Sequence, residues 1–540
     1  MNDLVIVQTT QGLASYLHSL YPNPATPLHV IIGYDHRCNP TLNLSSLKFA
    51  KIASAVFAKS NISSTVFSTL VATPLVPFAV QETSSALGIM VTASHNPKED
   101  DGFKVYWGNG CQIIPPHDSN ITEHILKNLT PWKLFDEEAL SEVVVNSGET
   151  TRLVDLYFKA ISNSLVKTST KSPKAPQNPH HPPPKFAYTA MHGVGHPFTK
   201  RSFEIFNLPE FIIVESQIEP DFTFPTVGFP NPEEKGALEE AKSVCEDRGG
   251  DIILANDPDA DRLAVAEKDR ETNEWTVFHG NEIGVMLGHW LWTNRDKTST
   301  KPVAMVASAV SSKMLRAIAE VEGFRFEETL TGFKWIGSRS VELREKENCS
   351  VLFSYEEAIG FCCGEIISDK DGVSAAGVFA TLANSIYEKG MNMKQHMQSL
   401  YAKYGEFVTN NGYYFCHDPK TATKIFSDMQ NGGKYWGEGI GEYKIKNVRD
   451  LSFPGYDSST EDKKPTLPVS KASPMITITF ENGCCMQFRA SGTEPKFKYY
   501  IELRGGVGES KEKVEGVLKE MSEYILEEIV KPDVNGLLKP

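Results

Sequence analysis

Long apolar runs are absent from this sequence of 540 residues. No stretch of about 18 or more apolar residues could form a membrane-spanning helix, and no basic-then-apolar segment near the start resembles a secretory signal. The nine cysteines form no Cys-x-x-Cys pair, and their odd number argues against a disulfide framework. We therefore expect a cytoplasmic protein with reduced, buried thiols.

Positive charge is also in short supply. The 54 basic and 68 acidic residues give a net charge of −14, which argues against nucleic acid or an anionic membrane as a partner. An anionic small molecule would need a local cluster of basic residues. Gly193 and Gly195 follow a predicted strand, but Phe198 stands where a dinucleotide-binding pattern needs its third glycine, which argues against that function.

The length exceeds what one hydrophobic core supports and predicts several domains. Strand-like and helix-like segments alternate in three successive stretches, which predicts α/β units with mixed, mostly parallel sheets. From about residue 413 the pattern changes to hairpin strands and a charged helix, which predicts a smaller α+β domain. The predicted domains are residues 1–150, 151–283, 284–408 and 409–540. The proline-rich segment 167–185 predicts a disordered insertion in the second domain.

The most informative serine, Ser94, comes shortly after a predicted core strand at 87–91. Because Pro97 cannot continue that strand, we expect Ser94 on a loop at its carboxyl end, where open α/β sheets bind ligands. His95 adds a second polar group beside it. An ordinary turn is the alternative. A serine hydrolase is disfavoured because the Gly-x-Ser-x-Gly pattern is missing.

Asp257, Asp259 and Asp261 alternate along the chain between two apolar runs. On an extended backbone such residues face the same side, and three adjacent carboxylates repel one another unless a cation lies among them. Oxygen ligands suit a hard ion, so the pattern predicts a Mg²⁺ site. A solvated acidic loop is the alternative. An EF-hand is excluded because Arg262 stands where its glycine is required.

A third polar cluster spans residues 489–498, after a hairpin predicted at Asn482-Gly483. Groups that bind phosphate crowd into it, and a polar turn with scattered charges is the alternative. These groups are Arg489, Ser491, Gly492, Thr493, Lys496 and Lys498. Serine, carboxylates and phosphate-binding loop together predict phosphoryl transfer through a phosphoserine. A non-catalytic binding protein would have no use for three aligned aspartates behind a serine.

At these positions the sequence resembles the α-D-phosphohexomutase superfamily, and most of all its eukaryotic phosphopentomutase type. The matching segments cover nearly the whole chain and include 92–97, 101–104, 257–262, 331–335, 356–360 and 489–495. The resemblance implies four domains around a central cleft, a monomer, and phosphorylated sugars as substrates. It implies that phosphate moves between C1 and the terminal carbon of a pentose or hexose, with a sugar bisphosphate as activator. A glucose-1,6-bisphosphate synthase of the same family is the serious alternative.

The resemblance also implies roles for individual residues. Among catalytic residues, Ser94 would carry the phosphoryl group, Lys104 or His95 would exchange a proton with the sugar, and Arg262 would offset charge. Ser94 would join the three aspartates as a Mg²⁺ ligand. The implied substrate-binding residues are Arg37, Thr331, Gly332, Glu356, Glu357, Lys370, Arg489, Ser491, Gly492, Thr493 and Lys498. A lowered pKa of Lys104, caused by neighbouring cations, would suit proton exchange.

Two departures from the family pattern lead to further expectations. Ala358 stands where hexose-preferring relatives have serine, which favours pentose 1-phosphates, with glucose 1-phosphate as a secondary substrate. The Phe-Gly-Thr-x-Gly-Leu-Arg segment of the family does not occur in this sequence. We therefore expect a short isoform or incomplete gene model whose first sheet lacks a strand, with reduced stability and activity. Arg37 would partly replace the lost arginine.

Overall fold

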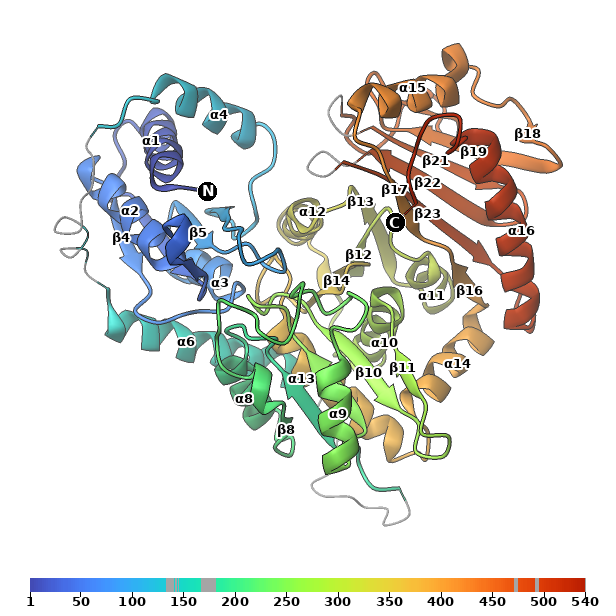
Figure 1. Cartoon of the computed structure of the whole chain (residues 1–540), viewed down its shortest axis with the longest axis horizontal. Helices are drawn as coiled ribbons and strands as arrows, with labels where there is room; N and C mark the ends of the chain where they lie inside the picture. The colour runs from blue at the N-terminus through green and yellow to red at the C-terminus, as the bar shows by residue number, and fades with distance from the viewer. Residues whose placement is uncertain are drawn as a thin grey trace. The chain divides into compact units, whose positions relative to one another are not determined.

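The computed structural model describes residues 1–132, 140, 143, 145–166, 181–470, 474–490 and 495–539. The chain forms two compact units (Figure 1), which are Met1–Ser311 with Phe324–His396, and Ser312–Gly323 with Met397–Pro540. Residues 167–180, most of the predicted insertion, lie outside the described residues. The four domain boundaries given above stay predictions.

The first region of the first unit is built on a four-stranded sheet. Its elements are α1 (Asp3–Leu20), β1 (His29–Tyr34), β2 (Cys38–Asn39), η1 (Pro40–Leu42), β3 (Leu44–Ser45), α2 (Ser46–Lys59), β4 (Ser63–Val66), α3 (Leu75–Glu82), β5 (Leu87–Val91), β6 (Phe103–Trp107) and α4 (His117–Lys127). The strand order is β4-β1-β5-β6, and only β6 is antiparallel to its neighbour. The apolar faces of α1 and α2 pack together into the core of this region, with Leu13, Leu17 and Phe49 buried.

The second region carries a five-stranded sheet of order β11-β10-β9-β7-β8. Its elements are α6 (Ser147–Ile161), η2 (Ser162–Val166), β7 (Phe186–Thr189), α8 (His196–Ile205), β8 (Ile212–Ile213), η3 (Glu215–Gln217), α9 (Glu239–Arg248), β9 (Ile252–Ala255), β10 (Ala264–Lys268) and β11 (Trp275–Val277). The central strands β7 and β9 are parallel and fully buried, as their uninterrupted apolar sequences predict. β10 returns antiparallel to β9.

The third region repeats the plan of the first with the sheet order β13-β12-β14-β15. Its elements are α10 (Gly280–Thr293), β12 (Val303–Ser308), β13 (Arg325–Thr329), α12 (Phe333–Glu345), β14 (Ser350–Glu356), β15 (Gly360–Cys363) and α13 (Gly372–Tyr387). β15 alone is antiparallel to its neighbour. Asp371 caps the N-terminus of helix α13, because its side chain accepts hydrogen bonds from the N–H groups of Val373 and Ser374.

The three sheets share one connection that positions polar residues. β5, β9 and β14 each lead through a short loop into an antiparallel neighbour, and these loops begin after the strand residues Val91, Ala255 and Glu356. Each loop contains a non-glycine residue in the left-handed region, with φ of 52° at Ser94, 56° at Ala260 and 50° at Ile359. This conformation costs about 1–3 kcal/mol and is concentrated at functional sites.

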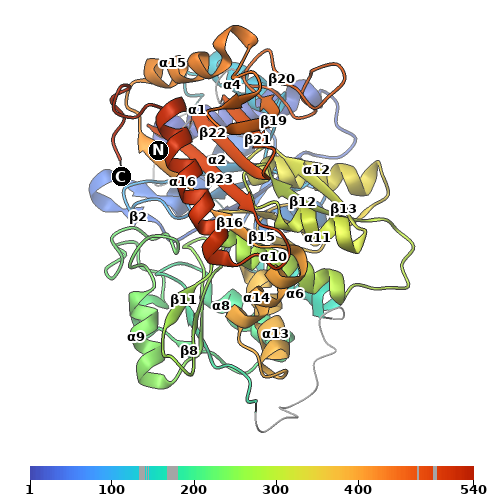
Figure 2. The same cartoon turned by 90° about the vertical axis from the view of Figure 1, so that its right-hand side faces the viewer.

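The second unit has a predominantly antiparallel sheet. Its strands are β16 (Phe407–Thr409), β17 (Gly412–Phe415), β18 (Gly439–Ile440), β19 (Tyr443–Asp450), β20 (Tyr456–Asp457), β21 (Met475–Phe480), β22 (Cys484–Ala490) and β23 (Lys496–Arg504). Its helices are α11 (Met314–Glu322), most of α14 (Met393–Tyr404), α15 (Pro419–Gln430), η4 (Asn431–Gly433) and α16 (Lys511–Ile529). Helix α16 lies against the sheet (Figure 2), and its Leu518 and Ile525 share one buried core with Met486 and Ile501 of the strands. These sheets confirm the predicted fold class.

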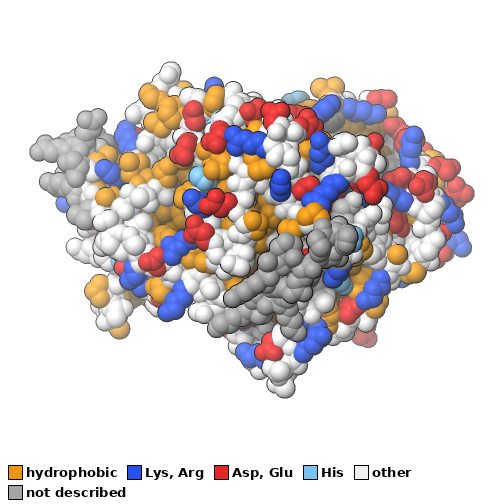
Figure 3. Space-filling view, turned by 90° about the horizontal axis from the view of Figure 1, so that it is seen from below, with side chains coloured by type: hydrophobic (Ala, Val, Ile, Leu, Met, Phe, Trp, Pro, Cys, Tyr) orange, Lys and Arg blue, Asp and Glu red, His pale blue; other side chains and the backbone are white. Residues whose placement is uncertain are grey.

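The described helices and the face drawn in Figure 3 bear on possible membrane and anionic partners. Among the residues that the structure describes, every helix is too short or too polar to cross a membrane. On the face drawn in Figure 3, acidic and basic side chains are interspersed with apolar ones. Because the net charge is −14, an anionic ligand needs a local basic site.

Candidate active site

Ser94 extends from the first region to the aspartate loop of the second. Its hydroxyl donates a hydrogen bond to Oδ2 of Asp257 at 2.9 Å. Its backbone N–H donates to Oγ1 of Thr92 at 2.9 Å, which helps to hold the left-handed turn at φ 52°. The structure thus brings together the serine and the carboxylates that the sequence placed more than 160 positions apart.

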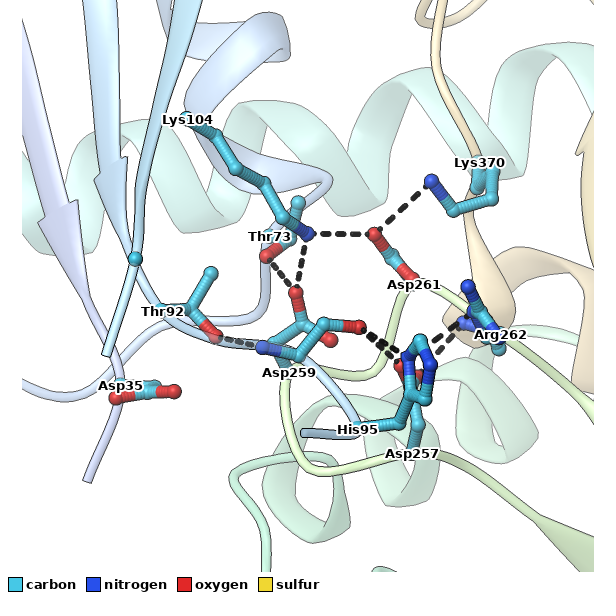
Figure 4. Close-up of polar contacts among 12 residues, drawn as sticks. Asp35, Thr73, Thr92, His95, Lys104, Asp257, Asp259, Asp261, Arg262 and Lys370 are labelled. Atoms are coloured by element: carbon cyan, nitrogen blue, oxygen red, sulfur yellow. Dashed lines mark hydrogen bonds and ion pairs between the residues drawn. The ribbon is translucent and has the colours of Figure 1, made fainter. Parts of the chain in front are cut away.

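The three aspartate side chains are buried together (Figure 4). Asp257, Asp259 and Asp261 are each 0 % exposed, and one oxygen of each lies within 4.8 Å of the others. Within the described part of the chain, Oδ1 of Asp259 and Oδ1 of Asp261 have no hydrogen-bond partner. Burial and the neighbouring carboxylates raise the pKa of Asp257 well above its usual value. Oxygen donors, unpaired lone pairs and mutual repulsion all fit a hard divalent cation such as Mg²⁺.

Three basic side chains surround these carboxylates (Figure 4). Nζ of Lys104 donates to Oδ2 of Asp259 at 2.6 Å and to Oδ2 of Asp261 at 2.9 Å. Nζ of Lys370 lies 3.3 Å from Oδ2 of Asp261. Nε of Arg262 lies 3.9 Å from Oδ2 of Asp257. The positive charges offset the negative ones, so the site as a whole can accept an anionic phosphoryl group.

The contacts of Lys104 correct a prediction made from the sequence. Burial alone would lower its pKa, but the carboxylates of Asp259 and Asp261 outweigh burial and raise the pKa well above its usual value. The lowered pKa expected above is therefore wrong in this structure, where the side chain is an ammonium group that donates to both carboxylates. No pattern in the sequence indicates that Lys104 reaches two aspartates at once.

His95 lies directly beside the serine hydroxyl. Its Nδ1 is 3.3 Å from Oγ of Ser94, and its ring is edge-on to that of Phe229 with 6.3 Å between the centroids. Burial and the positive charge of Arg262 lower the pKa of His95 to about 3. The imidazole is therefore neutral near physiological pH, and in that form one of its ring nitrogens is a hydrogen-bond acceptor.

The connection after β14 brings acidic groups to the same place. Glu356 is 8 % exposed, and its Oε1 lies 4.0 Å from Nζ of Lys370. Burial raises the pKa of Glu356, although Lys370 opposes this shift. Glu357 accepts a hydrogen bond at 2.8 Å from the serine hydroxyl at the end of β12. Before α12, Gly332 has φ 103°, and Oγ1 of Thr331 is buried with no partner among the described residues.

Arg37 lies on the loop after β1, as expected, but its contacts differ from those of a phosphate-binding residue. Its side chain is buried, and its guanidinium donates to the backbone carbonyls of Ser94, Asn96, Pro97 and Asp100. A guanidinium enclosed in this way has no face open to a substrate phosphate. Its contacts therefore correct the expectation that it replaces a phosphate-binding arginine.

Two residues that the sequence reasoning missed hold the aspartate loop in place. Thr73 donates from Oγ1 to Oδ2 of Asp259 at 2.6 Å and from its N–H to the carbonyl of Asp259 at 2.9 Å. A Cβ at Gly193 would lie 2.3 Å from Cα of Pro258, so only glycine allows the neighbouring Val194 N–H to reach the Pro258 carbonyl at 2.8 Å. Gly193 had a signal in the sequence, a glycine pair after a strand. Thr73 had none.

The predicted phosphate-binding loop belongs to the second unit and is described only in part. Ser491, Gly492 and Thr493 lie outside the described residues. Arg489 and Lys498 are direct partners across the ladder between β22 and β23. Directly opposed residues point to the same face of a sheet, so these two positive side chains are neighbours there.

Comparisons with known proteins agree with this architecture. Models of the phosphoglucomutase/phosphomannomutase α/β/α domains I, II and III match residues 1–131, 155–271 and 279–404, in that order. A human phosphopentomutase is 43 % identical over 99 % of this chain and 87 % of its own length. The chain belongs to the α-D-phosphohexomutase superfamily. The resemblance recognised from the motifs is thereby confirmed.

Comparison with other superfamily members shows which group within the superfamily the chain is similar to. A human glucose 1,6-bisphosphate synthase is 40 % identical over 100 % of this chain and 86 % of its own, and a Saccharomyces cerevisiae phosphoribomutase is 38 % identical over 93 % and 83 %. The chain is therefore a phosphosugar mutase of this phosphopentomutase-like group. Parafusin, a phosphoglucomutase from Paramecium solved in an open form, shares the fold with a TM-score of 0.67 at 18 % identity, over 99 % of this chain and 93 % of its own.

Proposed function

We propose that this protein is a phosphopentomutase that interconverts ribose or deoxyribose 1-phosphate and the corresponding 5-phosphate, with glucose 1-phosphate as a secondary substrate. The observation that carries the proposal is the hydrogen bond between Oγ of Ser94 and Asp257, inside a buried set of three carboxylates and three cations. The sequence similarity to phosphopentomutases supports the choice of substrate.

In the proposed reaction the phosphoryl group is carried by Ser94 between transfers, and water is not a reactant. The sugar hydroxyl oxygen attacks the phosphorus of phospho-Ser94, the bond from phosphorus to Oγ breaks, and a sugar bisphosphate forms. After the bisphosphate turns around, Oγ of Ser94 attacks its other phosphorus, and the bond to the sugar oxygen breaks. The proton lost by the attacking hydroxyl is returned to the oxygen that leaves, so atoms and charges balance over the cycle.

The charges around Ser94 suit this transfer. Asp257, Asp259 and Asp261 would hold Mg²⁺, with Ser94 as a further ligand, and the bound ion would supply positive charge to phosphoryl oxygens. Arg262 and Lys370 add positive charge from the protein. Groups fixed in a buried site stabilise a transferring phosphoryl group without reorganising during the reaction.

Two groups remain candidates for exchanging the proton of the sugar hydroxyl. Lys104 contacts two aspartates and His95 contacts the serine that carries the phosphoryl group. The single variants Lys104→Met and His95→Gln distinguish the two candidates when kcat is measured as a function of pH. The side chain whose replacement removes the acidic or alkaline limb of that pH profile is the proton carrier.

The sugar and its second phosphate need separate contacts. We propose that Glu356 and Glu357 accept hydrogen bonds from sugar hydroxyls, and that Thr331 donates from its buried hydroxyl. Arg489 and Lys498 would bind the phosphate that is not being transferred. A sugar bisphosphate would act as activator, because it phosphorylates Ser94 when the serine is bare.

A glucose-1,6-bisphosphate synthase is the second candidate, favoured by the relative of that name that matches the whole chain at 40 % identity. The test incubates purified protein with one of three sugar phosphates, namely ribose 1-phosphate, deoxyribose 1-phosphate or glucose 1-phosphate. Each is tested in two conditions, first with glucose 1,6-bisphosphate as activator and second with 1,3-bisphosphoglycerate as phosphoryl donor. A mutase forms the 5- or 6-phosphate in the first condition. A synthase accumulates sugar bisphosphate only in the second, and that outcome would refute the proposed activity.

A further inference from the structure

The loop that carries Ser94 is wrapped around one buried arginine. Arg37 follows β1 and is 2 % exposed. Nη2 donates to the carbonyls of Ser94 and Asn96 at 2.6 and 2.7 Å, and Nη1 donates to those of Pro97 and Asp100 at 2.7 and 3.0 Å. Four carbonyls from seven consecutive residues thus converge on a single guanidinium.

This convergence answers a problem of the loop itself. The carbonyl dipoles of these four residues point at one another and repel, and the guanidinium at their centre donates to all four. Within residues 94–100, the Asn96 and Asp100 N–H groups do close short turns, to Ala93 and Pro97. Ser94 also adopts a left-handed conformation, at φ 52°, which persists only where its surroundings enforce it. A donor fixed beneath the loop supplies that enforcement.

Arg37 is in turn held from two sides. Its Nε lies 3.4 Å from Oδ2 of Asp35, and its N–H donates to Oδ1 of the same carboxylate at 3.0 Å. On the other side its guanidinium lies over the ring of Phe224, 5.5 Å from the centroid. Phe224 belongs to the second region, which also carries the aspartate loop, so the arginine contacts both parts that must meet at Ser94. A lysine, with one nitrogen, cannot reproduce this planar fork.

We propose that Arg37 is a positioning residue, which fixes the conformation of loop 94–100 and thereby aims Oγ of Ser94 at the group it attacks. It acts through the loop backbone and does not touch the substrate. The proposal rests on the proposed phosphoryl transfer through Ser94, because only there does the aim of the hydroxyl affect a rate.

The test compares Arg37→Lys and Arg37→Gln with the wild type. Arg270→Lys is a matched control, since Arg270 also donates to two backbone carbonyls and a carboxylate, at Pro182, Pro183 and Asp251. We expect kcat to fall about 10- to 100-fold in the Arg37 variants at unchanged KM, because misplaced reacting atoms slow the chemical step. Amide hydrogen exchange at residues 94–100 should accelerate. The control should change kcat by no more than about twofold.

Each other outcome overturns the proposal. A raised KM with unchanged kcat would mean that Arg37 contacts the substrate. Unchanged kinetics would mean that loop 94–100 keeps its conformation without the Arg37 guanidinium. Failure of both variants to fold would show a role in the whole region rather than in the loop. If the wild type transfers phosphate to no sugar, the proposed function fails, while hydrogen exchange still decides whether Arg37 orders the loop.

Discussion

Thr73→Val tests whether the three aspartates form a metal site that depends on the first region. Thr73 is 0 % exposed and donates from Oγ1 to Oδ2 of Asp259 at 2.6 Å. Valine keeps the branched shape but removes the hydroxyl, so the change deletes one hydrogen bond and leaves no large cavity. Oδ2 of Asp259 would keep Lys104 as a partner. The backbone bond from Thr73 to Asp259 also stays.

The size of the effect follows from the kind of bond that is lost. A hydrogen bond to a charged group contributes about 1.5–3 kcal/mol. Groups that orient a metal ligand in this way typically change metal affinity or activity by about 10- to 100-fold when they are removed. We therefore expect Thr73→Val to weaken Mg²⁺ binding by a factor in this range, together with a loss of stability of similar origin.

The assay is calorimetric titration of Mg²⁺ into the purified protein, with urea unfolding measured on the same samples. Thr381→Val is the matched control, because Thr381 is 2 % exposed and donates at 2.8 Å to the neutral carbonyl of Gly377 in α13. The control should lose about 0.5–1.5 kcal/mol of stability and keep its Mg²⁺ affinity. Equal Mg²⁺ affinity in Thr73→Val and the wild type would refute the reasoning.

Three further changes probe other parts of the site. Asp259→Asn should abolish Mg²⁺-dependent activity while the fold persists, and unchanged Mg²⁺ dependence would place the ion elsewhere. Burial beside Asp35 raises the pKa of Asp101 to about 7, so the folded state holds a proton that the unfolded chain has lost. The free energy of unfolding should therefore fall as pH rises from about 4 to 7, and Asp101→Asn, followed by urea unfolding across this range, should reduce that fall. Ala358→Ser should shift kcat/KM from ribose towards glucose 1-phosphate by up to about tenfold; no shift would show that this position does not select the sugar.

The sequence was most informative where a buried strand ends in polar residues. The strands before Ser94 and Asp257 are short, apolar and fully buried. The short apolar run of each strand and the polar motif that follows it were therefore enough to locate both loops. The same local signal predicted the hairpin at Asn482 and Gly483, where β21 and β22 meet. Such features depend on neighbouring residues and can be read without knowledge of the fold.

Contacts between distant segments could not be predicted in the same way. Thr73 and Asp259 are 186 positions apart, and their hydrogen bond depends on how two sheets pack. Lys104 was expected near cations, but its pKa depends on the two carboxylates that it reaches. Arg37 was assigned by its type to a phosphate, whereas four loop carbonyls enclose it. A long cationic side chain does not reveal its partners until the surrounding backbone is placed.

The most direct test of the central claim is the phosphorylation state of Ser94 during turnover. Peptide mass spectrometry of protein treated with glucose 1,6-bisphosphate should find phosphate on Ser94, and adding excess ribose 1-phosphate or glucose 1-phosphate should remove it at a rate no slower than kcat. Ser94→Ala should show neither the phosphopeptide nor mutase activity. Full mutase activity in Ser94→Ala, or a stable phosphate on Ser94 that no sugar phosphate removes, would contradict the account.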